Sequence, residues 1–312
     1  MFAETRQRIN HTLTRLIAAW ERWHTPDWPL PWPIVLGLAL LAFYLVSQVD
    51  IREDWHFTFY PAGQNWLDPY ENSFHLVYPP WLALILALFT LLPEDLARGG
   101  FAAFSVILTA YTIRQLGGGF ITLVLVLLTP FYVTIMVRGM VDALALFGLG
   151  VAMAGGPSPF GQAAALLLLL LKPQMMLGAA AFLCLFTLKT AYQENRYTPV
   201  IQLGLGSGGW LLLSFLIYGW WPQEVWIRLP DLYQVDNISP WPWGIPIGLL
   251  LLGVAYHRHS LPWATLATGF FMPYLNWYSL GGYLVILFAR SPRWVAAAVL
   301  VLSWIWFIQY TA

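Results

Sequence analysis

The chain consists of long apolar runs separated by short polar segments. A transmembrane helix needs about 20 apolar residues, or fewer where it is broken or ends below the surface. The pattern predicts eleven such helices: Pro33–Val49, Gly99–Ile113, Phe120–Val137, Val141–Ala154, Gly161–Leu171, Gln174–Leu188, Pro199–Gly219, Trp243–Tyr256, Trp263–Leu275, Tyr278–Ala289 and Trp294–Tyr310. A twelfth apolar run, Pro80–Leu92, has only thirteen residues. We therefore expect an all-α, polytopic membrane protein.

Basic residues predict how these helices are oriented, because cytoplasmic loops are rich in Lys and Arg. Residues 1–30 carry arginines among apolar residues at helical spacing, which predicts an amphipathic helix on the cytoplasmic membrane surface. If Pro80–Leu92 lies in the outer interface or re-enters without crossing, most later basic loops also face the cytoplasm. Residues 31–312 then form one transmembrane domain with external loops at 50–98 and 220–242, and the C-terminus lies outside.

Composition supports the membrane assignment. The chain is 59% hydrophobic and 10% charged, far from the roughly 25% charged residues of soluble domains. Its mean hydropathy is +0.64, and its 18 Trp residues fit aromatic belts at bilayer interfaces. The net charge is zero, which gives no electrostatic case for a nucleic-acid partner. Cys184 is the single cysteine and is expected to be a buried, inert thiol within a helix.

Three acids, Asp50, Glu53 and Asp54, follow the first apolar run directly. Carboxylates at a membrane boundary are costly, so they either solvate a helix end or perform a task. A carboxylate in a partly dry cleft has a raised pKa and can act as a general base. The aromatic run to Tyr60 and the turn at Tyr78-Pro79-Pro80 are more structure than a connector needs. The loop is therefore interpreted as the active site of a membrane enzyme.

Two cations at membrane depth, Arg138 and Lys172, allow two interpretations. Arg138 could pair with Asp142 while Lys172 extends its ammonium to the interface. Alternatively both point into the external cavity beside the acidic loop and hold a lipid phosphate, Lys as a point charge and Arg as a fork. Pro173 breaks the helix after Lys172, which would help to aim the ammonium into a cavity.

Further candidates lie on the same external side. Arg228 is either a third phosphate contact or, as we favour, an anchor to lipid headgroups. The substrate cavity is expected to include Tyr60, Gln64, Tyr78, Asp142, Gln174, Asn237, Asn276 and Tyr278. No zinc site is expected, because His257 and His259 would be cytoplasmic and His56 and His75 are isolated. Nucleotide-binding glycine motifs and the GxSxG elbow are absent from the sequence.

In this order the motifs resemble the GT-C glycosyltransferases, in particular the polyprenol-phosphate-mannose-dependent mannosyltransferases of the actinobacterial lipid-glycan type. The first loop resembles that family's acid, aromatic run and Y-P-P-L element, here Asp54 to Tyr60, Ala62 to Tyr70 and Tyr78-Pro79-Pro80-Trp81. The later resembling elements are Arg138 to Asp142, Lys172-Pro173-Gln174, Asn237-Ile238-Ser239 and Pro273 to Tyr278. The chain departs from the family in Met140 and Asp142, which replace amides, and in one extra residue between Asp54 and Tyr60.

The resemblance implies a GT-C helical bundle and an inverting transfer of a sugar, mannose by analogy, from a polyprenyl-phosphate donor to an extracytoplasmic lipid or glycan acceptor. Asp54 would be the general base, with Asp50 and Glu53 as rivals, and Lys172, Arg138 and Arg228 would bind the donor phosphate. No cofactor is required, although the three acids could hold a divalent cation. The implied location is a bacterial inner or plasma membrane. A transporter or flippase for a lipid-linked or amphiphilic solute is the alternative, and a non-catalytic scaffold in cell-envelope glycan assembly is a third.

Overall fold

The computed structural model describes residues 28–50, 53–71, 73, 76–155, 158–233 and 237–311. These residues form fifteen α-helices and two short irregular helices, and they contain no strand. Of the expected amphipathic segment at residues 1–30, residues 1–27 lie outside the described residues. The helices are α2 (Trp32–Ser47), η1 (Trp55–Phe59), α3 (Tyr60–Gln64), α4 (Trp81–Ala87), α5 (Glu94–Gln115), α6 (Phe120–Leu127), α7 (Pro130–Arg138), α8 (Asp142–Met153), α9 (Pro159–Leu169), α10 (Pro173–Glu194), α11 (Thr198–Tyr218), α12 (Pro222–Tyr233), α13 (Ile245–Arg258), α14 (Leu261–Phe271), η2 (Trp277–Ser279), α15 (Leu280–Arg290) and α16 (Arg293–Thr311).

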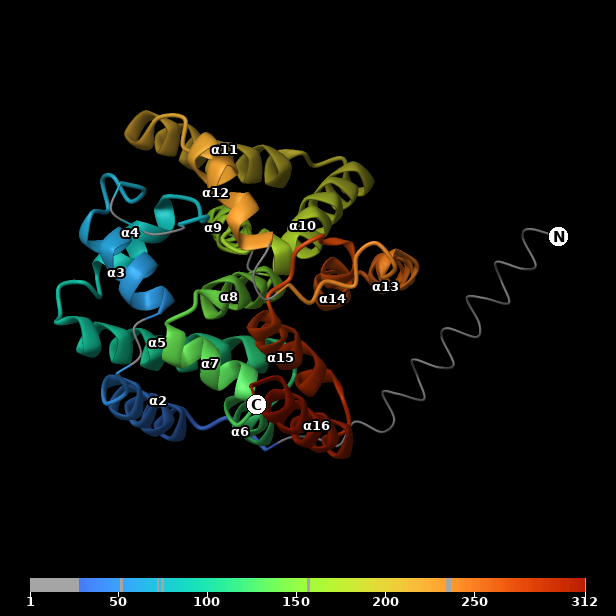
Figure 1. The fold of residues 1–312 in the computed structure, drawn as a ribbon. Helices are drawn as coiled ribbons and strands as arrows, with labels where there is room; N and C mark the ends of the chain where they lie inside the picture. The colour runs from blue at the N-terminus through green and yellow to red at the C-terminus, as the bar shows by residue number, and fades with distance from the viewer. Residues whose placement is uncertain are drawn as a thin grey trace.

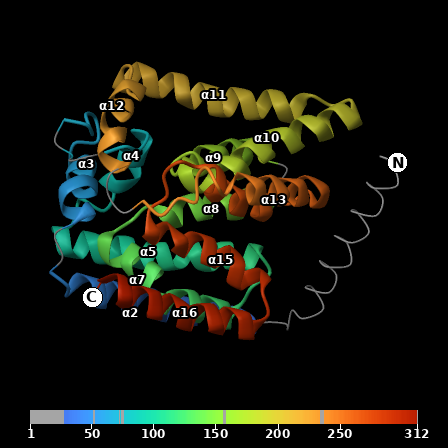
Figure 2. The ribbon, with the colours of Figure 1, turned by 45° about the vertical axis from the view of Figure 1, so that its right-hand side comes forward.

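The helices are stacked from α2 and α16 on one flank to α11 on the other (Figure 1), and many of the longer ones run in roughly the same direction in Figure 2. The short helices α3 and α4 of the first loop gather with α12 at one end of this stack (Figure 2). The helix α4 has seven residues, about 10 Å, which is too short to cross a bilayer. The loop helices therefore cover one end of the bundle.

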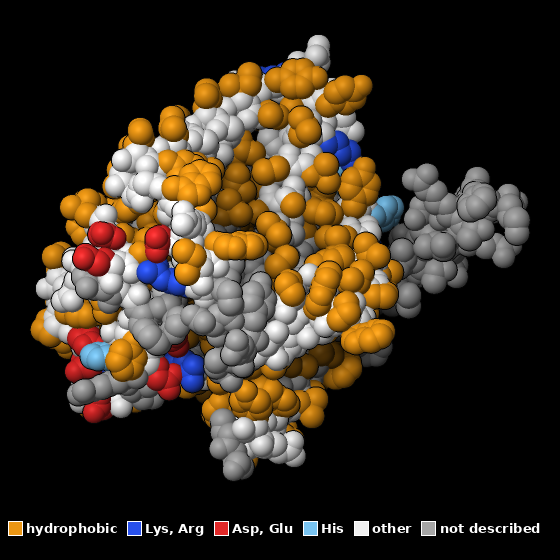
Figure 3. Space-filling model, turned by 45° about the horizontal axis from the view of Figure 1, so that its top comes forward, with side chains coloured by type: hydrophobic (Ala, Val, Ile, Leu, Met, Phe, Trp, Pro, Cys, Tyr) orange, Lys and Arg blue, Asp and Glu red, His pale blue; other side chains and the backbone are white. Residues whose placement is uncertain are grey.

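The apolar helices are those of a membrane protein. Four described helices are long and apolar enough to cross a bilayer: Glu94–Gln115, Pro173–Glu194, Thr198–Tyr218 and Arg293–Tyr310. A fifth crossing results if α6 and α7 count as one broken span. Hydrophobic side chains cover much of the outer surface, while the acidic ones gather at the left of the view in Figure 3. The eleven crossings expected from the sequence stay a prediction.

The predicted span Phe120–Val137 is divided into two helices, because α6 and α7 meet at a bend of 73°, as in a broken span or a re-entrant loop. Pro130 has no N–H to continue the helical ladder and begins α7 instead. The hydroxyl of Thr129 caps α7 by accepting a hydrogen bond from the N–H of Tyr132, at 3.2 Å. This bend brings the C-terminal end of α7 toward the first loop.

The first loop is fixed to the bundle by Arg98, which is buried on α5. Its guanidinium donates hydrogen bonds to the carbonyl oxygens of Val46, at 3.3 Å, and Val49 at the end of α2. Helix α5 begins at Glu94, five residues before the expected start at Gly99, and two acids in its first turn suit the positive helix end. The end of α2, from which Asp50 to Asp54 emerge, is therefore held against α5.

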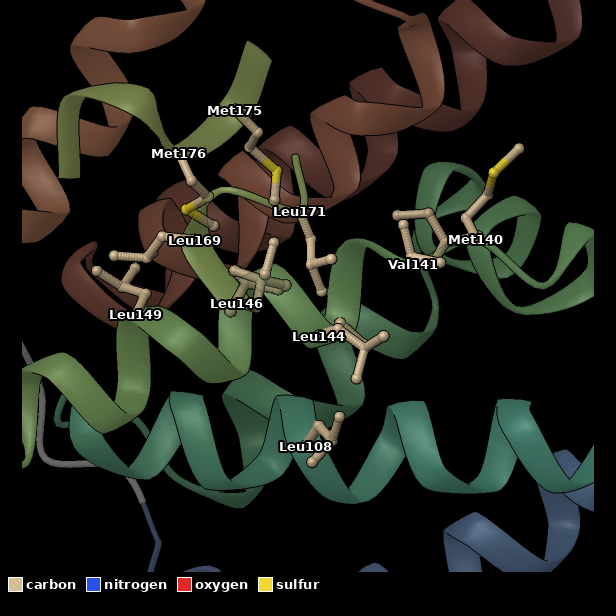
Figure 4. Close-up of a cluster of buried hydrophobic side chains, with 14 of the residues drawn as sticks. Leu108, Met140, Val141, Leu144, Leu146, Leu149, Leu169, Leu171, Met175 and Met176 are labelled. Atoms are coloured by element: carbon tan, nitrogen blue, oxygen red, sulfur yellow. The ribbon is translucent and has the colours of Figure 1, made fainter. Parts of the chain in front are cut away.

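The core lies where α8 packs between α5 and the α9–α10 pair. Figure 4 shows its side chains meeting from these helices, among them Leu108, Leu144, Leu146, Leu149, Leu169 and Met175. The expectation of a buried Cys184 was wrong, since its thiol is exposed on the outer side of α10, next to the buried Leu183. The apolar run alone could not tell which side of α10 faces the core.

The contact between α10 and α14 depends on Gly178. A Cβ added there would lie 2.3 Å from the carbonyl oxygen of Ala264, which is backbone and cannot easily yield. The exposed Gly204 of α11 has nothing within 4 Å of the same position and is a matched control. We expect Gly204→Ala to stabilise the protein by up to about 1 kcal/mol through helix propensity. Gly178→Ala should instead destabilise it by about 1–3 kcal/mol through overpacking.

The measurement is the apparent melting temperature of each detergent-purified variant. It is the temperature at which half of the monodisperse size-exclusion peak is lost after heating. Equal melting temperatures for the two variants would contradict the close packing of α10 on α14.

Candidate active site

Asp54 stands at the start of the irregular helix η1, whose five residues follow the wider π-helical pattern. Such segments are rare and often mark functional sites. The next residue, Trp55, is fully buried, and its ring packs 5.3 Å from that of Phe101 on α5. The anchored indole fixes the start of the loop helix and thereby the position of the Asp54 backbone.

Gly139 positions the neighbouring Arg138 close to Asp54. It ends α7 in the left-handed conformation, with φ of 68°, and the N–H of Met140 closes the turn by donating to the carbonyl of Ile135 at 2.8 Å. A Cβ on Gly139 would lie 2.4 Å from Cε3 of Trp55. The position therefore requires glycine both for its backbone conformation and for the close approach of the Trp55 ring.

The guanidinium of Arg138 pairs with both acids of the loop. Its Nε contacts the Glu53 carboxylate, and an Nη lies 3.7 Å from Oδ2 of Asp54. The side chains of Arg138 and Asp54 remain 25% and 37% exposed, so both can be reached from outside. A pair this accessible contributes at most about 1 kcal/mol to stability. The pair therefore adds little to the stability of the fold.

The pKa of Asp54 is raised above its ordinary value, mainly because burial penalises the carboxylate. The positive charge of Arg138 opposes the shift, while the neighbouring Glu53 adds to it. A raised pKa makes an ionised carboxylate a stronger proton acceptor, as a general base requires.

A second ion pair, between Lys172 and Asp142, lies deeper. Both side chains are 0% exposed, and the ammonium contacts Oδ2 of the carboxylate. Lys172 caps α10, which begins with Pro173, and Asp142 opens α8. A proline at the first helical position and an acid in the first turn are both favoured there. The alternative pair Arg138–Asp142 is not formed, because each cation has a different acid as its partner.

The ring of Tyr278 lies between the two ion pairs. Its centroid is 5.8 Å from the guanidinium carbon of Arg138 and 5.0 Å from the ammonium of Lys172. Both distances are within the range of cation–π attraction. Tyr78 from the first loop is buried nearby, and burial raises the pKa of its phenol well above the usual value. Its hydroxyl therefore stays protonated and able to donate.

Two buried acceptors in this region have no hydrogen-bond partner: Oδ1 of Asp142 and Oδ1 of Asn276. The Asn276 amide donates its N–H to the hydroxyl of Tyr278, so its orientation is fixed. Leaving such a buried acceptor unpaired costs about 1–3 kcal/mol. The site therefore offers two oxygen acceptors to a ligand that carries hydroxyl groups.

Two other candidates, Arg228 and Asn237, make contacts that hold loops in place. Arg228 donates to the carbonyl of Tyr70 at 2.9 Å, stacks on its ring and pairs with Glu224. Asn237 forms an isolated bridge with Asn276, and its side-chain oxygen accepts from the N–H groups of Ser239 and Leu275. It thus holds the Asn276 loop in place.

The remaining candidates make other contacts or are exposed. The hydroxyl of Tyr60 donates to the carbonyl of Leu92 at 3.1 Å, and the carbonyl of Gln174 accepts from Tyr283 at 3.2 Å. The side chains of Asp50 and Gln64 are exposed. These placements make Asp54 and Glu53 better positioned than Asp50 to meet Arg138.

Sequence reasoning missed three features of the site. It did not find the contact between Trp55 and Gly139, the pairing of Arg138 with both acids, or the bond between His56 and Glu94, at 2.7 Å. The partners are 38 or more residues apart, so no local spacing signals them. Within the described residues no group of three His, Cys, Asp or Glu side chains is placed to hold a metal ion. Comparison of the chain with protein-family models, with curated proteins and with solved structures gave no match.

The buried pair predicts a strong coupling between its members. Lys172→Met or Asp142→Leu alone leaves an uncompensated charge in an apolar interior and should cost about 3–5 kcal/mol of stability. The double variant removes both charges and should recover most of that loss. The measurement is a double-mutant cycle on apparent melting temperatures in detergent, with wild type, both single variants and the double variant. Additive losses would contradict a direct buried ion pair.

Proposed function

We propose that the protein is an integral-membrane inverting glycosyltransferase that uses a sugar on a polyprenyl phosphate as its donor. One observation carries this proposal. Three segments far apart in the sequence bring together a carboxylate of raised pKa, Asp54, with two cations, Arg138 and Lys172, around the Tyr278 ring. A base facing an acceptor and positive charge facing a leaving phosphate are what this reaction requires.

In the proposed step, the Asp54 carboxylate removes the proton from an acceptor hydroxyl. The resulting oxygen attacks the anomeric carbon on the face opposite the lipid phosphate and forms the new glycosidic bond. The bond between the anomeric carbon and the phosphate oxygen breaks, and polyprenyl phosphate leaves with that electron pair. General-base assistance of this kind contributes about 10²–10⁴-fold, and holding both substrates in line contributes much of the rest.

Arg138 is the cation best placed to meet the leaving phosphate. Its side chain is partly exposed, and a guanidinium has five N–H donors, of which the two acids use only some. Lys172 has no exposed surface and is engaged by Asp142. Lys172 therefore contributes its positive charge from the protein interior and fixes the position of Asp142 through their ion pair. It does not contact the phosphate directly.

The unpaired oxygens of Asp142 and Asn276 are the proposed acceptors for sugar hydroxyls. The aromatic rings of Tyr78, Trp277 and Tyr278 surround the same region and suit the apolar faces of a sugar ring. The choice of mannose rests on the motif resemblance alone.

The membrane arrangement belongs to the same proposal. The bundle crosses the bilayer eleven times, the site faces the extracytoplasmic side, and the polyprenyl tail lies between helices at the bilayer boundary. The exposed leucines along α2 and α11 are consistent with helices that face lipid.

The proposal predicts that Asp54→Asn abolishes sugar transfer. The assay uses purified full-length protein, radiolabelled polyprenyl-phosphate-mannose and a lipid extract, with glucose and arabinose donors in parallel. We expect a loss of about 10²–10⁴-fold because the amide cannot accept the proton. Asp68→Asn, at an exposed acid of the same loop, is the matched control and should keep wild-type transfer.

Full transfer by Asp54→Asn would contradict its role as base, and Glu53→Gln would then test the rival carboxylate. If wild-type protein transfers no sugar from any of the three donors, the enzyme proposal fails. A transporter of lipid-linked solutes would then be the better explanation.

The raised pKa of Asp54 predicts the acid side of the pH–rate profile. The base must be ionised, so activity is lost as the pH falls through a pKa that lies above the ordinary aspartate value. Arg138 lowers this pKa, so Arg138→Gln should raise it further and move the acid limb of kcat/KM to higher pH. Arg228→Gln should leave the limb in place, because Arg228 pairs with Glu224 and Tyr70 instead. An unmoved limb in Arg138→Gln would contradict the coupling.

A further inference from the structure

A cavity of about 910 Å³ opens at the other end of the bundle, away from Asp54. It is lined by the C-terminal ends of α8, α10 and α15, the start of α11, and the turn between α13 and α14. Its volume lies in the range of pockets that hold small organic ligands, about 300–1,000 Å³. Neither the base nor the ion pairs of the candidate active site contribute to it.

Three helices separate the cavity from the candidate active site. Helices α8, α10 and α15 each begin beside the active-site residues Asp142, Lys172 and Tyr278, and each ends at the cavity. The 22 residues of α10 span about 33 Å at 1.5 Å per residue. The two sites therefore lie at opposite ends of the same bundle.

Positive charge converges on the cavity from separate elements. Its lining includes Arg196 from the α10–α11 turn, Arg258 from the end of α13 and Arg290 from the end of α15, with Glu194 as the one acid. His259 also lines it, and its ring accepts a hydrogen bond from the ammonium of Lys189 at 3.1 Å when Nε2 is unprotonated. This excess of guanidinium groups favours an anion, since their planar fork matches phosphate oxygens.

Two helices also direct their N-terminal ends at the cavity. Thr198 and Pro199 begin the 21-residue helix α11, and Leu261 and Pro262 begin α14, and all four line the space. The unpaired N–H groups of a helix N-terminus carry partial positive charge and bind phosphate. The N-terminal ends of α11 and α14 therefore add to the positive charge of the arginines, and neither belongs to the candidate active site.

One acceptor in the lining has no partner. Oε1 of Gln162 on α9 is buried at the wall of the cavity and receives no hydrogen bond. A bare inorganic phosphate would neither fill the volume nor necessarily supply a donor to this oxygen.

We propose that the cavity binds a phosphate ester with free hydroxyl groups, of the glycerol phosphate class. The arginines and helix ends hold the phosphate, and Gln162 accepts from a hydroxyl. This site does not depend on the proposed transferase activity.

Such an ester can be a free metabolite or the headgroup of a lipid, and two binding assays on the full detergent-purified chain distinguish them. The first measures binding of sn-glycerol 3-phosphate by calorimetry, with glycerol as the uncharged control. The second measures retention of phosphatidylglycerol against phosphatidylcholine by native mass spectrometry. We expect saturable binding of the phosphate ester in at least one assay and none of glycerol.

Arg196→Glu is the decisive variant because Arg196 is exposed and its replacement should not disturb folding. Arg114→Glu is its matched control: Arg114 is an exposed arginine at the end of α5, on the same side of the bundle but outside the cavity lining. We expect Arg196→Glu and Arg258→Gln to weaken binding at least about tenfold, and Arg114→Glu to leave it unchanged.

Loss of glycerol phosphate binding in the two cavity variants supports a site for a free ester. Loss of phosphatidylglycerol retention alone supports a lipid headgroup. The proposal is overturned if wild-type protein binds neither ligand. It is also overturned if Arg114→Glu weakens binding as much as Arg196→Glu, because general surface charge would then explain the affinity. If Arg258→Gln does not fold, Arg196→Glu decides the outcome.

Discussion

The arrangement of the candidate active site depends on the need to neutralise charge inside a hydrocarbon-rich bundle. Removing an ion from water costs several kcal/mol, so buried Lys172 requires a buried acid with good geometry. Asp142 meets that need from the first turn of α8, and the contact joins the α7–α8 junction to the α9–α10 junction. Tyr278 packs against the ammonium and so adds the start of α15. Three chain reversals are thereby held together at one end of the molecule.

The two ends of the bundle differ in how they treat charge. At the Asp54 end, acids and cations are paired closely, and aromatic rings cover much of what remains. At the other end, arginines surround an open cavity with a single glutamate among them. Between the ends, the helices present apolar side chains outward and pack small or branched ones inward. One end therefore pairs its charges within the protein, and the other concentrates positive charge around a cavity.

The sequence predicted the helical class and most helix positions, because apolar runs are local signals. It also singled out the isolated charges Asp54, Arg138 and Lys172, whose functional roles stay a prediction. It did not predict the partners of these charges, which depend on how distant helices pack. It also missed the bend at Pro130, where an unbroken apolar run concealed a break in the backbone hydrogen bonds. The outward position of Cys184 was missed for a related reason, since hydrophobic residues occupy every side of α10.

The contact between Trp55 and Gly139 has a consequence for how this chain can change over time. The indole fills the space where a side chain at position 139 would stand, so the two positions share one volume. A larger residue at position 139 is acceptable only if a smaller side chain replaces Trp55. The backbone at 139 must also leave the left-handed conformation, with φ of 68°, that glycine now adopts. Because Asp54 and Arg138 immediately precede these two residues, such a double change would also displace both charges. Relatives that keep this acid and this arginine should therefore keep glycine at position 139 wherever they keep Trp at position 55.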